Sequence, residues 1–116
     1  MGMFSNRTES LDALRGRIRE CLKPLRPAKV IVYGSCVRGE GDRDSDIDLI
    51  VVLDSETTPQ TYRERMENRL TVRRALDALN RDYALDVLVY TWPQWRRFQE
   101  MGSAFSREVV SQGVEL

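Results

Sequence analysis

The chain has no histidine among its 116 residues, and only two cysteines and two lysines. The absence of histidine excludes the commonest general base and a frequent metal ligand, so acid–base chemistry falls to carboxylates. It also excludes a Cys–His nucleophile. Cys21 and Cys36 provide neither a disulfide framework nor a zinc site, so we expect free thiols in a reducing cytoplasm.

Long hydrophobic runs and a net charge are also missing. No apolar stretch reaches the length of a membrane span, and the N-terminus lacks the hydrophobic segment of a signal peptide. Eighteen basic residues balance eighteen acidic ones, so no overall positive field attracts nucleic acid. The hydrophobic content of 41% is typical of a globular protein, and we expect one cytoplasmic domain spanning residues 1–116.

Three aspartates lie at the starts of apolar segments. Asp46 and Asp48 begin the segment 46–53, and Asp86 lies near the start of the segment 84–91. Alternate side chains of a strand share a face, so Asp46 and Asp48 point the same way. Two carboxylates about 5 Å apart repel by roughly 3 kcal/mol at an effective dielectric near 20, a cost that no fold requires. Divalent cations such as Mg²⁺ reverse this repulsion, because they prefer carboxylate, water and phosphate oxygens.

A Gly-Ser pair, Gly34 and Ser35, follows the apolar segment 28–33. Glycine allows a sharp turn and the close approach of a ligand to the backbone. Ser35 is suited to cap a short following helix, whose free N–H groups would favour a phosphate, and Arg38 adds a positive charge. Alone, the pair also fits an ordinary strand–turn–helix connection; with the aspartates it predicts a phosphate site.

The combined pattern VYGS-x2-RG-x5-SDIDLIV at residues 32–51, with Asp86 on a later strand, resembles the nucleotidyltransferases of the DNA polymerase beta superfamily. The resemblance covers about residues 28–90 and is closest to the minimal (MNT-type) members. It implies that Asp46 and Asp48 hold two Mg²⁺ ions, and that Asp86 helps to hold the second ion and activates the attacking hydroxyl. It also implies that Gly34 and Ser35 bind the phosphates of ATP. Arg38 and Ser45 are further implied phosphate contacts, in less diagnostic positions of the motif.

The same resemblance implies transfer of AMP from ATP to a hydroxyl acceptor. Minimal members often pair with a HEPN-type toxin and, acting as its antitoxin, can place AMP on a tyrosine of the toxin. This chain ends soon after its third expected strand, so we expect a partner or a second copy, as in a homodimer, to build the acceptor side. Two alternatives stay open: an aminoglycoside-type small-molecule adenylyltransferase, and an antitoxin that acts by binding without catalysis.

Apolar periodicity predicts an α/β fold, a small mixed sheet flanked by helices and similar to the polymerase beta palm core. The short link between the first two strands favours antiparallel pairing, and the helical crossover to the third favours parallel pairing. Residues 38–45 are expected to form a loop over the site. The expected strands are 28–33, 46–53 and 84–91, and the expected helices are 8–22, 59–80, a short one from Pro93, and 103–112.

Side-chain patterns extend these predictions. Thr58 is expected to cap the long helix, with Pro59 at its first position. Core or lid packing is favoured over a base-stacking platform or a partner surface for the aromatic cluster Trp92, Trp95 and Phe98. The predicted inward-facing residues are Tyr62, Met66, Leu70, Leu76 and Leu79 in the long helix, and Phe105, Val109 and Val110 in the last one.

Overall fold

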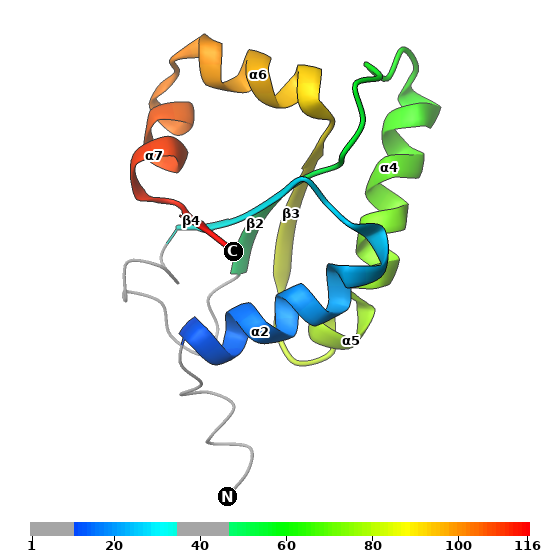
Figure 1. Ribbon diagram of the computed structural model, residues 1–116, viewed down its shortest axis with the longest axis vertical. Coiled ribbons are helices and arrows are strands. Elements are labelled where there is room, and N and C mark those ends of the chain that lie inside the picture. The colour runs from blue at the N-terminus through cyan, green and yellow to red at the C-terminus, as the bar shows by residue number, and fades with distance from the viewer. Residues whose placement is uncertain (1–10, 35–46) are drawn as a thin grey trace, which may run out of the picture.

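The computed structural model describes residues 11–34 and 47–116, which form a four-stranded mixed sheet with helices on both faces (Figure 1). The strands are β1 (Lys29–Tyr33), β2 (Ile47–Val52), β3 (Leu85–Tyr90) and β4 (Val114–Glu115). The described helices are α2 (Leu11–Leu22), the 3-10 turn η1 (Lys23–Leu25), α4 (Tyr62–Ala75), α5 (Asp77–Asn80), α6 (Trp92–Met101) and α7 (Ala104–Gln112). The predicted α/β fold class is confirmed.

The sheet has the order β3-β2-β1-β4. β1 and β2 pair antiparallel, whereas β2 and β3 pair parallel through the α4–α5 crossover, both as predicted. β4 is an addition that the sequence pattern did not predict, because two residues are too short to show a strand period. An ion pair between Lys29 of β1 and Glu115 of β4, with N–O distances of 3.2 Å, accompanies this pairing.

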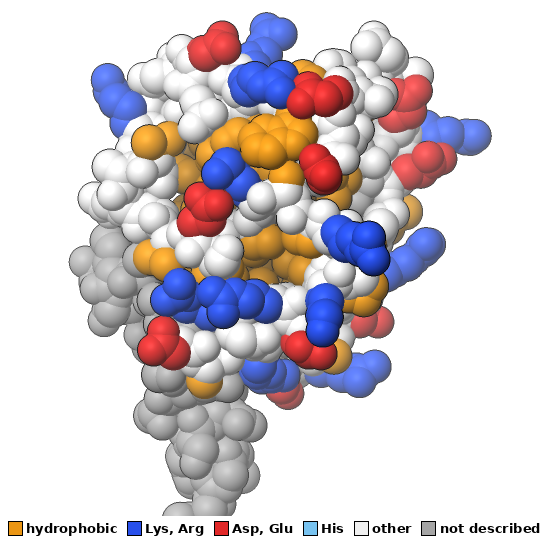
Figure 2. Space-filling view, in the orientation of Figure 1, with side chains coloured by type: hydrophobic (Ala, Val, Ile, Leu, Met, Phe, Trp, Pro, Cys, Tyr) orange, Lys and Arg blue, Asp and Glu red, His pale blue; other side chains and the backbone are white. Residues whose placement is uncertain are grey.

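Two hydrophobic layers cover the sheet, because alternate strand residues point to opposite faces. Figure 1 shows α2, α4 and α5 on one side of the sheet and α6 and α7 on the other. The first layer buries helix residues such as Ile18 and Leu79 against Val32 and Leu49. In Figure 2, hydrophobic side chains are visible between the two helical layers, with charged side chains around them.

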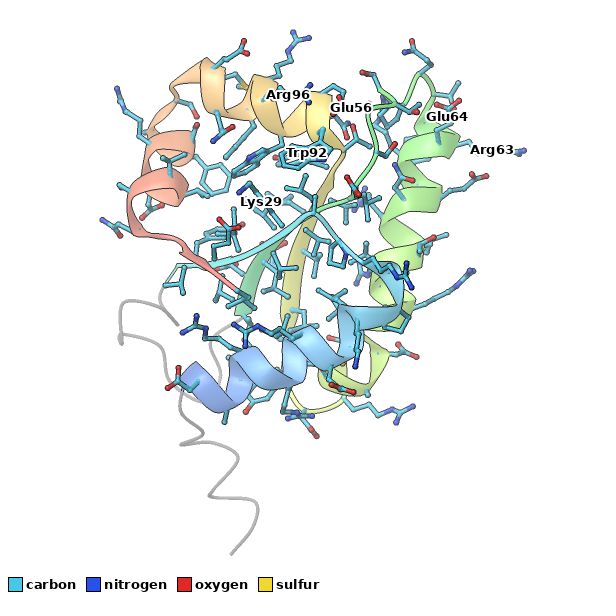
Figure 3. The ribbon with its side chains drawn as sticks, viewed as in Figure 1. Lys29, Glu56, Arg63, Glu64, Trp92 and Arg96 are labelled. Carbon is cyan, nitrogen blue, oxygen red and sulfur yellow. The ribbon has the colours of Figure 1, made fainter. Side chains whose placement is uncertain are left out.

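The second layer is built on aromatic rings. Trp95 and Phe98 are buried, with ring centroids 5.5 Å apart, which confirms the predicted core packing. Trp92 is half-buried, and its indole N–H donates to Asp54 at 3.1 Å. Figure 3 shows Arg96 and Glu56 near Trp92; their ion pair of 2.7 Å joins α6 to the segment before α4.

The long helix differs from its prediction at both ends. α4 begins at Tyr62 rather than at Pro59, because Thr61 is the cap: its hydroxyl accepts the N–H of Glu64 at 3.1 Å. The Glu64 carboxylate reaches back to accept the N–H of Gln60 at 2.6 Å. The helix then breaks at Leu76, and α5 follows as a separate turn.

The predicted buried stripes are wrong in part. Leu76 and Leu79 are buried and Met66 is half-buried, but Tyr62 is 66% exposed and Leu70 is 40% exposed. Only the C-terminal half of the crossover reaches the core, where Val72 is also buried. In α7, Val109 is buried as predicted, whereas Phe105 and Val110 are exposed by 40% and 57%.

Replacing Thr61 with alanine should lower the free energy of unfolding by about 1 kcal/mol, since the N–H of Glu64 loses its cap. Urea denaturation monitored by circular dichroism measures the change. Thr58→Ala is the matched control and should change stability by less than half as much, because Thr58 lies outside the helix. A larger loss for Thr58→Ala would contradict the observed helix start.

Candidate active site

Asp48 and Asp86 lie side by side on neighbouring parallel strands. The register pairs them directly at the ends where β2 and β3 begin. Paired residues of adjacent strands lie about 5 Å apart at the backbone and point to the same face. Asp86 is exposed and Asp48 is half-buried, and both lie on the face that α6 and α7 cover. The structure therefore brings two of the three predicted acids together.

The other predicted polar residues, Ser35, Arg38, Ser45 and Asp46, lie outside the described residues, as does the expected loop at 38–45. Their assignment to the site stays a prediction. Within residues 11–34 and 47–116, no group of three or more Cys, Asp or Glu side chains is placed to hold a metal ion. The described helices also include none that is long and apolar enough to cross a membrane.

Gly34 ends β1 directly against the carboxylate of Asp48. Its φ is +86°, in the left-handed region that side-chain-bearing residues rarely adopt. A Cβ at this position would collide with Oδ2 of Asp48. Only glycine fits here, because both the backbone conformation and the position of the Asp48 carboxylate exclude a side chain.

Tyr33 extends the row of acids across a third strand. It pairs with Asp48 in the antiparallel register of β1 and β2, and its ring packs edge-to-face on Phe105 with centroids 5.5 Å apart. Burial, followed by the negative charges of Asp48 and Asp86, raises the pKa of Tyr33 well above its usual range. Tyr33 was not predicted from the sequence, because the pattern indicated the antiparallel pairing of the two strands but not the register that sets Tyr33 opposite Asp48.

Tyr33→Phe should make the protein more resistant to alkaline unfolding. The folded-state pKa of Tyr33 is raised, so its contribution to stability is full below the ordinary pKa of about 10 and is lost as the pH rises beyond it. Thermal unfolding at pH 8 and pH 11 measures this. From pH 8 to pH 11 the melting temperature of the wild type should fall further than that of Tyr33→Phe. Equal falls would contradict a tyrosine that burial and the acids keep neutral.

The donor set suits a hard divalent cation. Two carboxylates held in register present oxygen ligands to the same volume, and such ligands favour Mg²⁺ or Mn²⁺ over softer metals. Their like charges repel when nothing lies between them, so a bound cation would be favourable electrostatically. With Asp46, two residues before Asp48 in the sequence, the residues fit the metal that the sequence pattern implies.

Comparisons with known proteins identify the family of the domain. The sequence profile of the nucleotidyltransferase domain matches residues 14–97, a range that includes Gly34, Asp48 and Asp86. No curated protein gives a significant match.

Two solved structures are similar in fold. One is a toxin–antitoxin structure with AMP-PNP, with a TM-score of 0.50 and 22% identity over 86% of this chain and 69% of that one. The other is a Sulfolobus solfataricus protein assigned as a nucleotidyltransferase, with a TM-score of 0.56 and 16% identity over 99% of this chain and 86% of that one. Because the domain profile covers most of the sequence and both structures share the fold, this chain belongs to the nucleotidyltransferase domain family of the DNA polymerase beta superfamily.

Proposed function

We propose that this chain transfers AMP from ATP to a hydroxyl group, and that the acceptor is a tyrosine of a HEPN-type toxin for which the chain is the antitoxin. The observation that carries the chemistry is the register of Asp48 and Asp86, with Gly34 packed against Asp48. Membership of the nucleotidyltransferase family supports the reaction type. The fold similarity to a toxin–antitoxin structure with AMP-PNP supports the antitoxin role and the adenine nucleotide.

The two described acids differ in exposure, and this difference suggests different roles. Asp48 is half-buried beside Gly34, so it suits the nucleotide side together with Asp46. Asp86 is exposed at the start of β3, where a hydroxyl arriving from solvent can reach it. Mg²⁺, when bound by these three aspartates, neutralises the charge of the phosphates.

The reaction then follows from the residues. The acceptor oxygen attacks the α-phosphorus of ATP, and its proton passes to the carboxylate of Asp86. The bond between the α-phosphorus and the oxygen that bridges to the β-phosphate breaks, and pyrophosphate leaves with that oxygen. Gly34 lets the carboxylate of Asp48 pack directly against the backbone, because it has no side chain. Ser35, Arg38 and Ser45 are the predicted donors to the phosphate oxygens.

The test uses the purified protein, Mg²⁺, ATP labelled at the α-phosphate and the protein encoded by the neighbouring gene. We expect little labelling of this chain alone, and addition of one or more AMP groups to a tyrosine of the partner, identified by mass spectrometry. Asp46→Asn should bind the partner without modifying it. Asp77→Asn, an exposed acid on α5, is the matched control and should transfer AMP normally.

Two outcomes would overturn parts of the proposal. If Asp46→Asn still neutralises the partner fully in cells, inhibition occurs by contact and catalysis is not its basis. If an aminoglycoside becomes labelled with no protein partner present, the chain is a small-molecule adenylyltransferase instead.

A further inference from the structure

β3 has an open edge. The N–H of Ile47 donates to the carbonyl of Ala84 at 2.9 Å, and the N–H of Leu53 donates to the carbonyl of Tyr90 at 2.7 Å. Even-numbered residues of β3 therefore direct their backbone groups toward β2, and the alternate residues direct theirs away from the sheet. No strand in the described part of the chain pairs on that side. The open edge consists of the backbone groups of Leu85, Val87 and Val89.

A hollow of about 160 Å³ lies at this open edge. Its lining includes Val89, whose side chain faces α4, and Tyr90, whose side chain faces α6. Val89 and Tyr90 are the last two residues of β3, so the hollow lies by the end of the open strand, beside α4. Arg65 and Arg69 of α4 and Gln94 of α6 also line it.

An arginine row accompanies the edge. Arg65, Arg69 and Arg73 lie four residues apart on α4, and Arg73 lines a smaller hollow with Leu85 and Val87. Four helical residues rise about 6 Å, close to the roughly 6.6 Å between alternate residues of a strand. No carboxylate in the described residues forms an ion pair with any of these three guanidinium groups.

We propose that an extended acidic segment of a protein partner adds to the open edge of β3 as a further strand, with its carboxylates on the arginine row. Strand addition supplies backbone hydrogen bonds to the open edge, and side chains supply specificity. A second copy of this chain fits poorly, because antiparallel pairing of two β3 edges would place the two arginine rows side by side.

The added strand would end beside the acids, because Leu85 of the open edge directly precedes Asp86. Side chains of an added strand alternate between the two faces, so its carboxylates would lie on the α4 face. The intervening residues would lie on the face of Asp48 and Asp86, and one of them could present a hydroxyl there. This part rests on the proposed function and specifies its acceptor: a hydroxyl residue next to alternating acidic residues.

The experiment uses a fluorescein-labelled peptide of sequence EVEVEYE and its basic counterpart KVKVKYK, with the full-length protein. Fluorescence anisotropy should show binding of the acidic peptide alone, weakening at least several-fold between 50 and 500 mM salt. Backbone amide exchange followed by NMR should slow at Leu85, Val87 and Val89 when the acidic peptide binds.

Charge-reversing substitutions distinguish binding at the arginine row from a general effect of the protein's charge. Arg69→Glu/Arg73→Glu should weaken binding of the acidic peptide by tenfold or more. Arg63→Glu/Arg74→Glu is the matched control with the same change in charge, and Figure 3 shows Arg63 directed away from the sheet. Val87→Pro removes the central open N–H and should abolish binding, with a melting curve to verify folding.

The proposal is overturned if both double variants bind the peptide equally, or if the peptide binds without slowing exchange at the open edge. Tighter binding of a single-stranded RNA, lost in Arg69→Glu/Arg73→Glu with no slowed exchange, would make the row a phosphate-binding surface instead. A dimer that protects the same amides would assign the edge to a second copy. Asp86→Asn should still bind the peptide, because docking does not need the proposed base. If the wild-type protein binds the peptide but never transfers AMP to it, the proposed reaction is contradicted and the docking site stands.

Discussion

Replacing Asp86 with asparagine should lower the rate of AMP transfer by roughly 10²-fold or more, the scale expected for a lost general base. Asparagine keeps the shape of the side chain but cannot accept the hydroxyl proton. ATP binding should remain largely intact, because Asp48 and Asp46 are proposed to serve the nucleotide side. Single-turnover transfer to the partner measures the rate, and calorimetry with ATP and Mg²⁺ measures binding.

The folded state should tolerate this change. Asp86 is exposed, and its neighbour in the register is another carboxylate, so the substitution removes a like-charge contact. Asp77→Asn serves again as the control. Near-normal turnover of Asp86→Asn would mean that Asp86 is structural, and Asp44 or Asp82 would then be the next acid to test.

Gly34→Ala should impair the site and the fold together. The new methyl group would meet the carboxylate of Asp48, and the residue would have to hold a φ of +86°. The backbone strain alone is about 1–2 kcal/mol in the free energy of unfolding. We expect ATP affinity to fall at least tenfold, because the carboxylate of Asp48 must leave its place against Gly34. Urea denaturation and calorimetry measure the two effects.

Gly16→Ala is the matched control for this variant. Gly16 lies inside α2, and a Cβ there meets no atom within 4 Å. Alanine should therefore stabilise the protein by about 0.5–1 kcal/mol and leave ATP binding unchanged. Wild-type ATP affinity in Gly34→Ala would show that the glycine is not needed for the position of Asp48.

The local hydrophobic pattern was enough to predict the three long strands and their pairing. The apolar segments ending at Tyr33 and starting near Asp46 and Asp86 predicted three strands, and the lengths of their connections predicted the pairing. The predicted parallel pairing is consistent with the observed neighbours Asp48 and Asp86, because a parallel pair brings the starts of both strands to the same end of the sheet.

The start of α4 was decided by local contacts that the sequence analysis did not use. Thr58 and Thr61 are both competent caps, and the contact of Glu64 with Gln60 selects the second. Tertiary packing decided which residues of the crossover are buried. Tyr62 and Leu70 follow the helical period, yet they are exposed because only the C-terminal half of the crossover reaches the core.

By itself, then, the sequence determined the fold class, the strand pairing and the position of one acid near the start of each of β2 and β3, since these depend on short-range periodicity and on chain connectivity. The structure alone placed Tyr33 beside the acids, added β4 to the sheet and left an edge of β3 open beside an arginine row. These features join residues far apart in the chain, and such contacts depend on which surfaces pack together rather than on any local repeat.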